Sequence, residues 1–218
     1  KPLIELNGKP LFVRAIESVR VEGAPMKYSF IVRKEHIDDY GVDRSIRAIL
    51  PEANIYSVEK TTRGAVETCL IAENGIDDDD TVVVMDCDLE FRSNEYRRLI
   101  EAALNTAGDK ARGGALVSFE SDEPKYSYAE VGDDGLVKRT AEKEVISNHA
   151  LCGAYFFASG REFKAAAHRL LDEPVMLKPE FYVSLLYNYL LRDGSPVRLA
   201  TMEMYRSYGT PEELKQWQ

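Results

Sequence analysis

Short apolar runs alternate with amphipathic stretches along the first part of the chain. Leu11, Ala15 and Val19 recur every fourth residue, which predicts a helix that begins near Pro10. Apolar runs predict strands over 28–32, 53–58, 81–86 and 114–119, with helices over 35–50, 64–75 and 94–107. The run TVVVMD at 81–86 is typical of a central parallel strand buried on both faces. This alternation predicts an α/β layer on a mostly parallel sheet.

The rhythm changes in the second half of the chain. Two short alternating runs flank Asp133, Asp134 and Gly135, a turn signal that predicts a β-hairpin. Further strands are expected in ALCGAYFF and VRLATM, with helices over 161–171 and 180–192. Thr210, Pro211 and Glu213 predict a capping box and a C-terminal helix. No repeat, linker or boundary is visible, so a single domain over 1–218 is expected, with its second part adding strands to the same sheet.

Composition narrows the function classes. With 28 Lys plus Arg against 37 Asp plus Glu, the net charge of −9 argues against a nucleic-acid binder with a broad basic surface. No apolar stretch approaches the ~18 residues of a membrane span, and no signal peptide is visible. Three scattered cysteines fit a reducing compartment, so a cytoplasmic location is expected. The three scattered histidines make a zinc site improbable.

The clearest candidate chemistry follows the run at 81–86. Asp86 and Asp88 stand at its carboxyl end, the edge at which open α/β sheets bind ligands. Two carboxylates spaced i, i+2 can face one side of an extended chain, and hard oxygen ligands suit Mg²⁺ held together with substrate phosphates. On the residues alone, a pair of loop or capping aspartates explains the pattern equally. The acidic turn at 77–80 is better explained as a solvated loop than as a metal site.

Other candidates are weak in isolation. Glu142 can accept hydrogen bonds from hydroxyls and Lys143 can hold a phosphate, but the pair also fits an ordinary charged turn. Gly64 opens a loop-to-helix junction, where backbone N–H groups can receive an anion or a base edge, or simply begin a helix. Lys1 alone is a terminal lysine.

Taken in order, six segments resemble motifs of the sugar-1-phosphate nucleotidyltransferase family, the sugar-nucleotide pyrophosphorylases. They are KPLIELNGKP, TRGAVET, VVVMDCDLEF, YSYAEVGDDGLVKRTAEK, CGAYFF and YGTPEEL, and they cover nearly all of the chain. Among such proteins, the sequence most resembles the small nucleotidyltransferase-like proteins of bacterial capsule and surface-polysaccharide biosynthesis. The resemblance implies a Rossmann-like, mostly parallel mixed sheet with helices on both faces.

The resemblance also implies a reaction. The oxygen of a sugar-1-phosphate attacks the α-phosphorus of a nucleoside triphosphate and pyrophosphate leaves, with Mg²⁺ as cofactor; catalysis is then alignment and neutralisation of phosphate charge. Roughly residues 1–120 would bind the nucleotide, and about 121–218 would form the sugar-binding part and the C-terminal helices. Neither a nucleic acid nor a membrane is implied. The oligomeric state stays open, although members often form dimers or tetramers, so a homo-oligomer is compatible with the family.

Individual roles follow from the same resemblance. Asp88 corresponds best to the metal-binding aspartate, with Asp86 as an additional carboxylate, and Lys1 to the lysine that contacts phosphates. The implied substrate-binding residues are Gly64 and Ala65 for the base, Glu142 for sugar hydroxyls, Lys143 for the sugar phosphate, and Tyr126, Ser127, Gly153 and Glu180 around the sugar.

The sequence departs from the family pattern at two places. The pattern begins with a glycine-rich loop and an arginine before the motif lysine, so we expect that loop to precede Lys1 and expect residues 1–218 alone to bind nucleotide poorly. Many members also have an aspartate where Ser207 stands, so one metal carboxylate is absent or supplied elsewhere.

Two other functions remain open. A glycosyltransferase of the nucleotide-sugar-binding α/β type would also carry the pattern Asp86-Cys87-Asp88, although the segments AEK and YGTPEEL argue against it. A non-catalytic nucleotide-sugar-binding relative would be consistent with Ser207. Pyrophosphate release separates the transferase from both. The nucleobase and the sugar cannot be told from the sequence.

Overall fold

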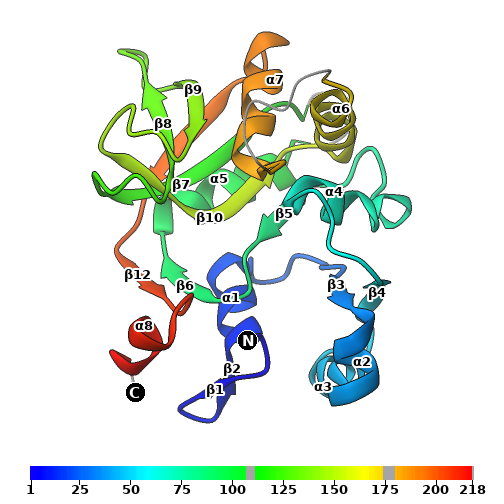
Figure 1. Ribbon diagram of the computed structural model, residues 1–218. Coiled ribbons are helices and arrows are strands. Elements are labelled where there is room, and N and C mark those ends of the chain that lie inside the picture. Colours follow the sequence, from blue (N-terminus) through cyan, green and yellow to red (C-terminus); the bar gives the residue numbers. More distant parts are fainter. Residues whose placement is uncertain (107–110, 174–179, 218) are drawn as a thin grey trace.

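The centre of the fold is a mixed six-stranded sheet, seen in a computed structural model that describes residues 1–106, 111–173 and 180–217 (Figure 1). Its strands in spatial order are β11 (Val197–Thr201), β7 (Gly114–Glu120), β10 (His149–Phe157), β8 (Ser127–Val131) and β9 (Val137–Glu142), with β5 (Val82–Met85) also paired to β10. β5, β7 and β8 all run antiparallel to β10, and β11 runs parallel to β7, so these four share one direction. The α/β fold class with a mixed sheet is confirmed; among the strand pairs of this sheet in the described residues, β7–β11 is parallel and the other four are antiparallel.

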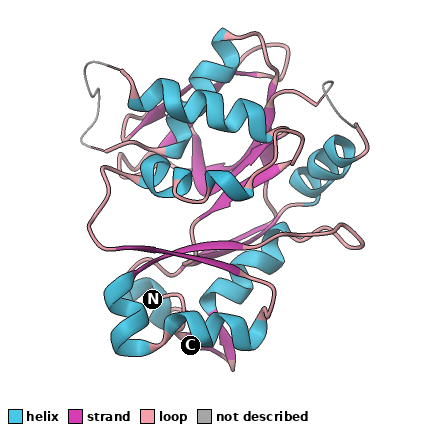
Figure 2. Cartoon of the chain, turned by 90° about the vertical axis from the view of Figure 1, so that its right-hand side faces the viewer, coloured by secondary structure: helices cyan, strands magenta, loops and turns pink. Residues whose placement is uncertain are grey.

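Helices cover both faces of the sheet because the strands alternate between two cores. Leu116, Tyr155 and Phe157 point into one core, together with α4 (Ala65–Leu70), α6 (Gly160–Leu171) and α7 (Leu186–Arg192). Val117 and Phe156 point into the other, which they share with α1 (Leu11–Val19) and α5 (Asn94–Leu104). In the view of Figure 2, helices accordingly lie on both sides of the strands. Within the described residues, no helix is long and apolar enough to cross a membrane.

The N-terminal part packs around its own small core of Phe12, Val42, Ile46 and Ala53. Its elements are the hairpin β1 (Glu5–Leu6) and β2 (Lys9–Pro10), the parallel pair β3 (Ser29–Arg33) and β4 (Asn54–Val58), and the helices α2 (Lys34–Tyr40) and α3 (Val42–Ile49). The single helix expected over 35–50 is wrong. Gly41 adopts a left-handed conformation with φ 59°, which ends α2 and lets α3 begin at the next residue.

Four other sequence-based expectations need correction. β5 is not a parallel strand buried on both faces: it pairs antiparallel with β10, and of its residues only Val82 is fully buried. The helix expected over 64–75 ends at Leu70 and is followed by the short 3₁₀ turn η1 (Glu73–Gly75). The helix expected over 180–192 begins as η3 (Val183–Leu185) and becomes α-helical only in α7. The expected helix over 94–107 ends at Leu104, and residue 107 lies outside the described residues.

The C-terminal segment returns to the middle of the chain. β6 (Leu89–Arg92) pairs antiparallel with β12 (Met204–Ser207), which places Ser207 opposite Leu89. The Tyr208 amide donates to the carbonyl oxygen of Asp88 at 2.8 Å. α8 (Pro211–Lys215) follows, and the predicted capping box is present at its start. This arrangement brings the segment YGTPEEL beside the Asp86–Asp88 loop.

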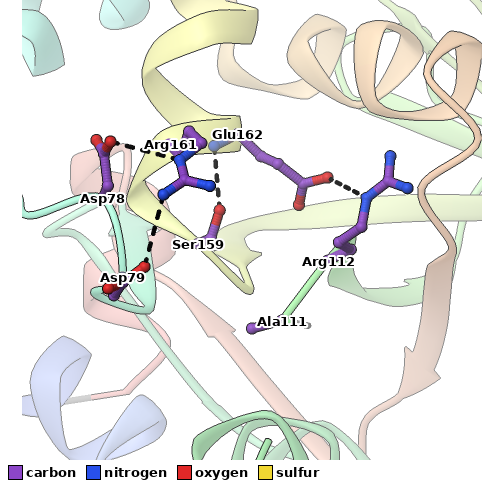
Figure 3. Close-up of a pocket in the computed structure, with 7 residues that line it drawn as sticks. All are labelled: Asp78, Asp79, Ala111, Arg112, Ser159, Arg161 and Glu162. Carbon is purple, nitrogen blue, oxygen red and sulfur yellow. Dashed lines mark hydrogen bonds and ion pairs between the residues drawn. The ribbon is translucent and has the colours of Figure 1, made fainter. Parts of the chain in front are cut away.

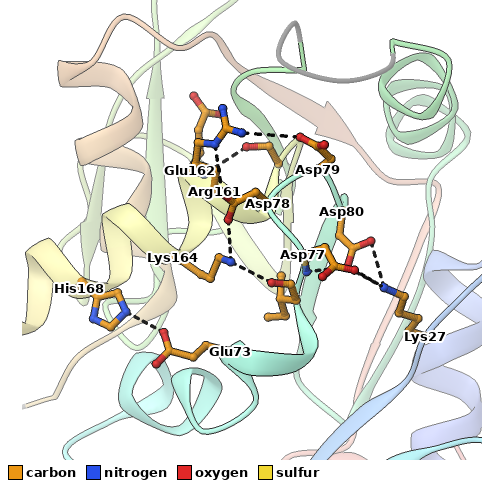
Figure 4. Close-up of polar contacts among 12 residues, drawn as sticks. Lys27, Glu73, Asp77, Asp78, Asp79, Asp80, Arg161, Glu162, Lys164 and His168 are labelled. Carbon is orange, nitrogen blue, oxygen red and sulfur yellow. Dashed lines mark hydrogen bonds and ion pairs between the residues drawn. The ribbon is translucent and has the colours of Figure 1, made fainter.

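The acidic turn at 77–80 is an exposed loop, as expected, and its carboxylates are ion-paired (Figure 4). Lys27 lies 3.0 Å from Asp77, and Lys164 lies 2.8 Å from Asp78. The carbonyl of Asp80 accepts from the Gly160 amide at 2.7 Å, which attaches the start of α6 to the turn. A cavity of about 130 Å³ opens beside it (Figure 3). Its charged groups pair with one another, with Arg161 near Asp78 and Asp79, and Arg112 near Glu162, which favours a structural role.

Candidate active site

A larger cavity of about 390 Å³ opens where β5 ends, beside the open end of the β8–β9 hairpin. It brings together all but two of the site residues predicted from the sequence. Those lining it are Ala65, Asp86, Asp88, Tyr126, Ser127, Glu142, Lys143, Gly153 and Glu180. The sequence prediction did not include Lys125, Tyr155, Tyr182 or Tyr205, which line it as well. Gly64 and Lys1 are the two predicted residues that do not line the cavity.

Asp86 and Asp88 are the first and last residues of the short loop between β5 and β6. The Asp86 carboxylate is open to the cavity, although protein surrounds it on most sides. Burial, followed by the charges of Asp88 and Glu142, raises the pKa of Asp86 to about 7. Two such hard oxygen ligands fit a magnesium ion that completes its shell with phosphate oxygens and water. In the part of the chain that the structure describes, no cluster of three or more Asp, Glu, His or Cys side chains could hold a metal by itself.

Gly153 forms the wall behind Asp86. It lies in β10 where the register to β7 shifts between Leu151 and Tyr155, and its φ of 94° favours glycine. Its carbonyl accepts from the Asp86 amide at 3.0 Å. A Cβ at this position would meet Asp86 Oδ2 well inside the 3.0 Å that real Cβ atoms keep. Glycine is therefore what allows the carboxylate to lie against the strand.

Lys1 lies at the rim, beyond the residues that line the cavity. Its Nζ is 3.3 Å from Asp88 Oδ2 and also donates to the carbonyl of Gly209. Ser207 does line the cavity, but its hydroxyl donates to Glu213 Oε2 at 2.8 Å. A neutral hydroxyl bound to a neighbouring carboxylate thus stands where many members of the resembled family have an aspartate.

Glu142 ends β9 and is 4% exposed. Its Oε2 accepts hydrogen bonds from the hydroxyls of Ser127 and Ser184, the latter at 2.8 Å. Ser127 stands directly opposite Glu142 in the β8–β9 ladder. These bonds fix the orientation of the carboxylate, which makes it suited to accept from a ligand hydroxyl. No local pattern in the sequence points to Ser184, because it lies 42 residues away.

Lys143 follows Glu142 with a positive φ of 53°, which is unusual for a residue with a side chain. Its amide donates to the Tyr126 carbonyl at 3.0 Å, and its Nζ donates to the Tyr182 hydroxyl at 2.8 Å. The same Nζ lies 5.0 Å from the centre of the Tyr182 ring. The bond to Tyr182 raises the pKa of Lys143, so the side chain is an ammonium at neutral pH.

The need for glycine at position 64 is explained by the backbone of Phe181, which packs directly against it. A Cβ there would collide with the backbone nitrogen of Phe181. The Phe181 amide donates to the Arg63 carbonyl, and the Phe181 carbonyl accepts from the Val66 amide, both at 3.0 Å. Close packing of these two segments therefore accounts for the glycine without a ligand. Contact of Gly64 with a nucleobase stays a prediction, whereas the neighbouring Ala65 faces the cavity.

Comparison with known proteins gives a consistent result. A model of the nucleotidyl transferase family matches residues 1–184. The structure is similar to that of the nucleoside-diphosphate-sugar pyrophosphorylase from Vibrio cholerae RC9, with a TM-score of 0.81 and 23% identity, covering 100% of this chain and 90% of that chain. It also resembles a protein described as a glucose-1-phosphate thymidylyltransferase from Bacillus anthracis, in complex with sucrose. The TM-score is 0.73 and the identity is 18%, and the match covers 100% of this chain and 84% of that chain. No curated protein matches the sequence.

Proposed function

The chain belongs to the nucleotidyl transferase family, and on that premise we propose that it joins a nucleoside triphosphate to a sugar-1-phosphate or a similar phosphorylated small molecule, releasing pyrophosphate. One observation carries this proposal. A pair of aspartates, a fixed buried glutamate and an ammonium group line a single cavity. The names of the two similar structures, one a nucleoside-diphosphate-sugar pyrophosphorylase and the other a glucose-1-phosphate thymidylyltransferase, support the same class of acceptor.

On the nucleotide side, Asp86 and Asp88 would hold Mg²⁺. When bound, the ion would neutralise charge on the phosphates during transfer. Lys1 pairs with Asp88, which keeps its ammonium beside these carboxylates and available to a phosphate oxygen. Ala65 faces the cavity from the start of α4 and, with the adjacent Gly64, would contact the base. These residues do their work by alignment and charge compensation, and none acts as a covalent nucleophile.

On the acceptor side, Lys143 would hold the phosphate and Glu142 would accept from sugar hydroxyls. Tyr126, which precedes β8, Ser127 from β8, Gly153 from β10 and Glu180 would complete the sugar pocket. The backbone bonds of Phe181 join this side to the 63–66 turn on the nucleotide side. Binding of one substrate would therefore help to position the segment that receives the other.

Pyrophosphate release tests the proposal. The full-length protein would be incubated with Mg²⁺, each common nucleoside triphosphate, and a panel of sugar-1-phosphates and phosphocholine. Release with one pair of substrates, lost in Asp88→Asn, would establish the reaction and identify both substrates. Silence across the whole panel would contradict it.

One observation favours a second candidate, a non-catalytic nucleotide-sugar-binding relative. Ser207 offers no carboxylate, and its hydroxyl is engaged by Glu213. Such a protein would bind a nucleotide sugar, as measured by calorimetry, without forming or releasing pyrophosphate.

The setting of the reaction is part of the same proposal. A single domain over 1–218 would carry both substrate sides, in the cytoplasm, and its product would serve polysaccharide biosynthesis. The free thiols Cys69, Cys87 and Cys152 are in keeping with a reducing compartment. The overall charge of −9 argues against a nucleic-acid partner and is compatible with a local basic pocket for a phosphate.

A further inference from the structure

A second lysine lines the acceptor side of the cavity. Lys125 precedes Tyr126 at the open end of the β8–β9 hairpin. In the ladder Ser127 stands opposite Glu142, and the Lys143 amide donates to the Tyr126 carbonyl. Lys125 and Lys143 therefore leave the same end of the hairpin on adjacent strands. The sequence motifs do not single out Lys125, because the segment Pro124 to Tyr126 is typical of a turn that leads into a strand.

Each of the two lysines lies near the ring of a tyrosine. Lys125 Nζ lies 4.8 Å from the centre of the Tyr126 ring, and Lys143 Nζ lies 5.0 Å from the centre of the Tyr182 ring. A tyrosine face attracts an ammonium group and narrows the positions that a flexible lysine takes up. Both rings line the cavity, so each ammonium is kept at its wall.

The ion pair of Lys125 leaves its ammonium group available to a ligand. Lys125 Nζ lies 3.0 Å from Glu123 Oε2, but the two side chains are 53% and 58% exposed. An exposed pair of this kind contributes little stability and is readily exchanged for a stronger partner. Glu123, and after it Tyr126, raises the pKa of Lys125 to about 12, so the ammonium form is present at any physiological pH.

We propose that Lys125 is a second binding residue for the acceptor phosphate, acting together with Lys143. The inference rests on the proposed function and deepens it. A phosphate monoester carries a charge of about −1.5 to −2 at neutral pH, which one ammonium compensates only in part. Asp86, Asp88, Glu142 and Glu180 line the same cavity and oppose an anion, so the phosphate needs a doubly cationic end. The two lysine–tyrosine pairs supply it.

Residue-resolved acylation tests this with inorganic phosphate as the probe. The protein is treated with a limiting amount of an amine-acetylating reagent in increasing phosphate, against chloride at the same ionic strength. Labelling of each lysine is then quantified by peptide mass spectrometry. Lys138 is the matched control: it lies on the same hairpin, is 52% exposed, and pairs with Asp134 at 2.7 Å, but does not line the cavity.

Phosphate should slow the labelling of Lys125 and Lys143 with the same half-saturating concentration and leave Lys138 unchanged. In Lys143→Ala, protection of Lys125 should require about tenfold more phosphate, because one charge-assisted contact is lost. Lys138→Ala should change nothing.

Protection of Lys143 without Lys125 would overturn this inference and leave the proposed function standing. Protection of Lys125 that is indifferent to Lys143→Ala would also overturn it, since the lysines would then serve separate sites. Protection of neither would remove the phosphate role from both lysines. Pyrophosphate release reports on the transfer reaction independently of every one of these outcomes.

Discussion

The carboxylate of Asp86 occupies the space in which a side chain on Gly153 would begin. The positive φ of Gly153 and the register shift in β10 create that space, and the Asp86 amide is bonded to the Gly153 carbonyl. A carboxylate proposed to hold the metal thus depends on the absence of one methyl group on the neighbouring strand.

Replacing Gly153 by alanine should therefore abolish turnover by displacing Asp86. Because alanine is strained at a positive φ, the substitution should also lower the free energy of unfolding by about 1–3 kcal/mol. Gly135→Ala is the matched control: Gly135 has a φ of 74° but nothing within 4 Å of its would-be Cβ. Turnover and urea denaturation of both variants separate the two effects. Equal loss of activity in the two variants would contradict the contact argument.

Asp88→Asn should reduce metal-dependent turnover by about 10²–10³-fold while the fold is kept, because an amide is a poor ligand for Mg²⁺. Binding of Mn²⁺, followed by electron paramagnetic resonance, should weaken in parallel. Asp133→Asn, in the hairpin turn and away from the cavity, should leave both unchanged. Wild-type metal binding in Asp88→Asn would show that the metal assignment is wrong.

Lys143→Ala should raise the KM for the phosphorylated acceptor about tenfold, with a smaller change in kcat. Alanine keeps the Cβ and hence the same backbone strain at φ 53°, so the change isolates the ammonium group. Steady-state kinetics with each substrate varied in turn provide the measurement, and Lys138→Ala provides the control. An effect confined to the nucleoside triphosphate would place Lys143 at the other phosphate instead.

The raised pKa of Asp86 predicts a pH dependence of stability in the metal-free protein. The Asp86 carboxyl has a pKa of about 7 in the native protein, whereas the ordinary pKa of an aspartate, which applies to the unfolded chain, is 3.8. Between these values the native state binds more protons than the unfolded state, so the free energy of unfolding falls as the pH rises. Water in the cavity screens the charge and reduces the size of this effect.

Asp86→Asn should flatten that decline. Urea denaturation with a chelator present, from pH 5 to pH 8, measures it. Asp133→Asn should keep the wild-type slope. If Asp86→Asn also followed the wild-type curve, the carboxyl would be ionised normally in the folded protein.

Features that depend on a few adjacent residues could be predicted from the sequence. The hairpin turn at Asp133–Gly135 and the capping box of Thr210 and Glu213 are both present, because each is made by groups within a few residues of one another. Gly41 was an equally local signal for a helix end, and it divides the helix expected over 35–50. The direction of β5 relative to its neighbour could not be read in this way, since the apolar run does not reveal that the later strand β10 pairs with it.

The sequence by itself determined the order of the motifs, the α/β class and the residue types of the cavity, because these follow from local periodicity and from motifs read along the chain. Only the tertiary structure decided which side chains meet. Lys143 donates a hydrogen bond to Tyr182, which lies 39 residues away, and Ser184 donates one to Glu142, which lies 42 residues away. The backbone of Phe181 leaves no space for a side chain at Gly64. The tertiary structure also showed that Lys125 and Lys143 line the same cavity. The physical reason is that strand pairing and register set the distance between side chains remote in sequence, and neither is encoded in any single segment.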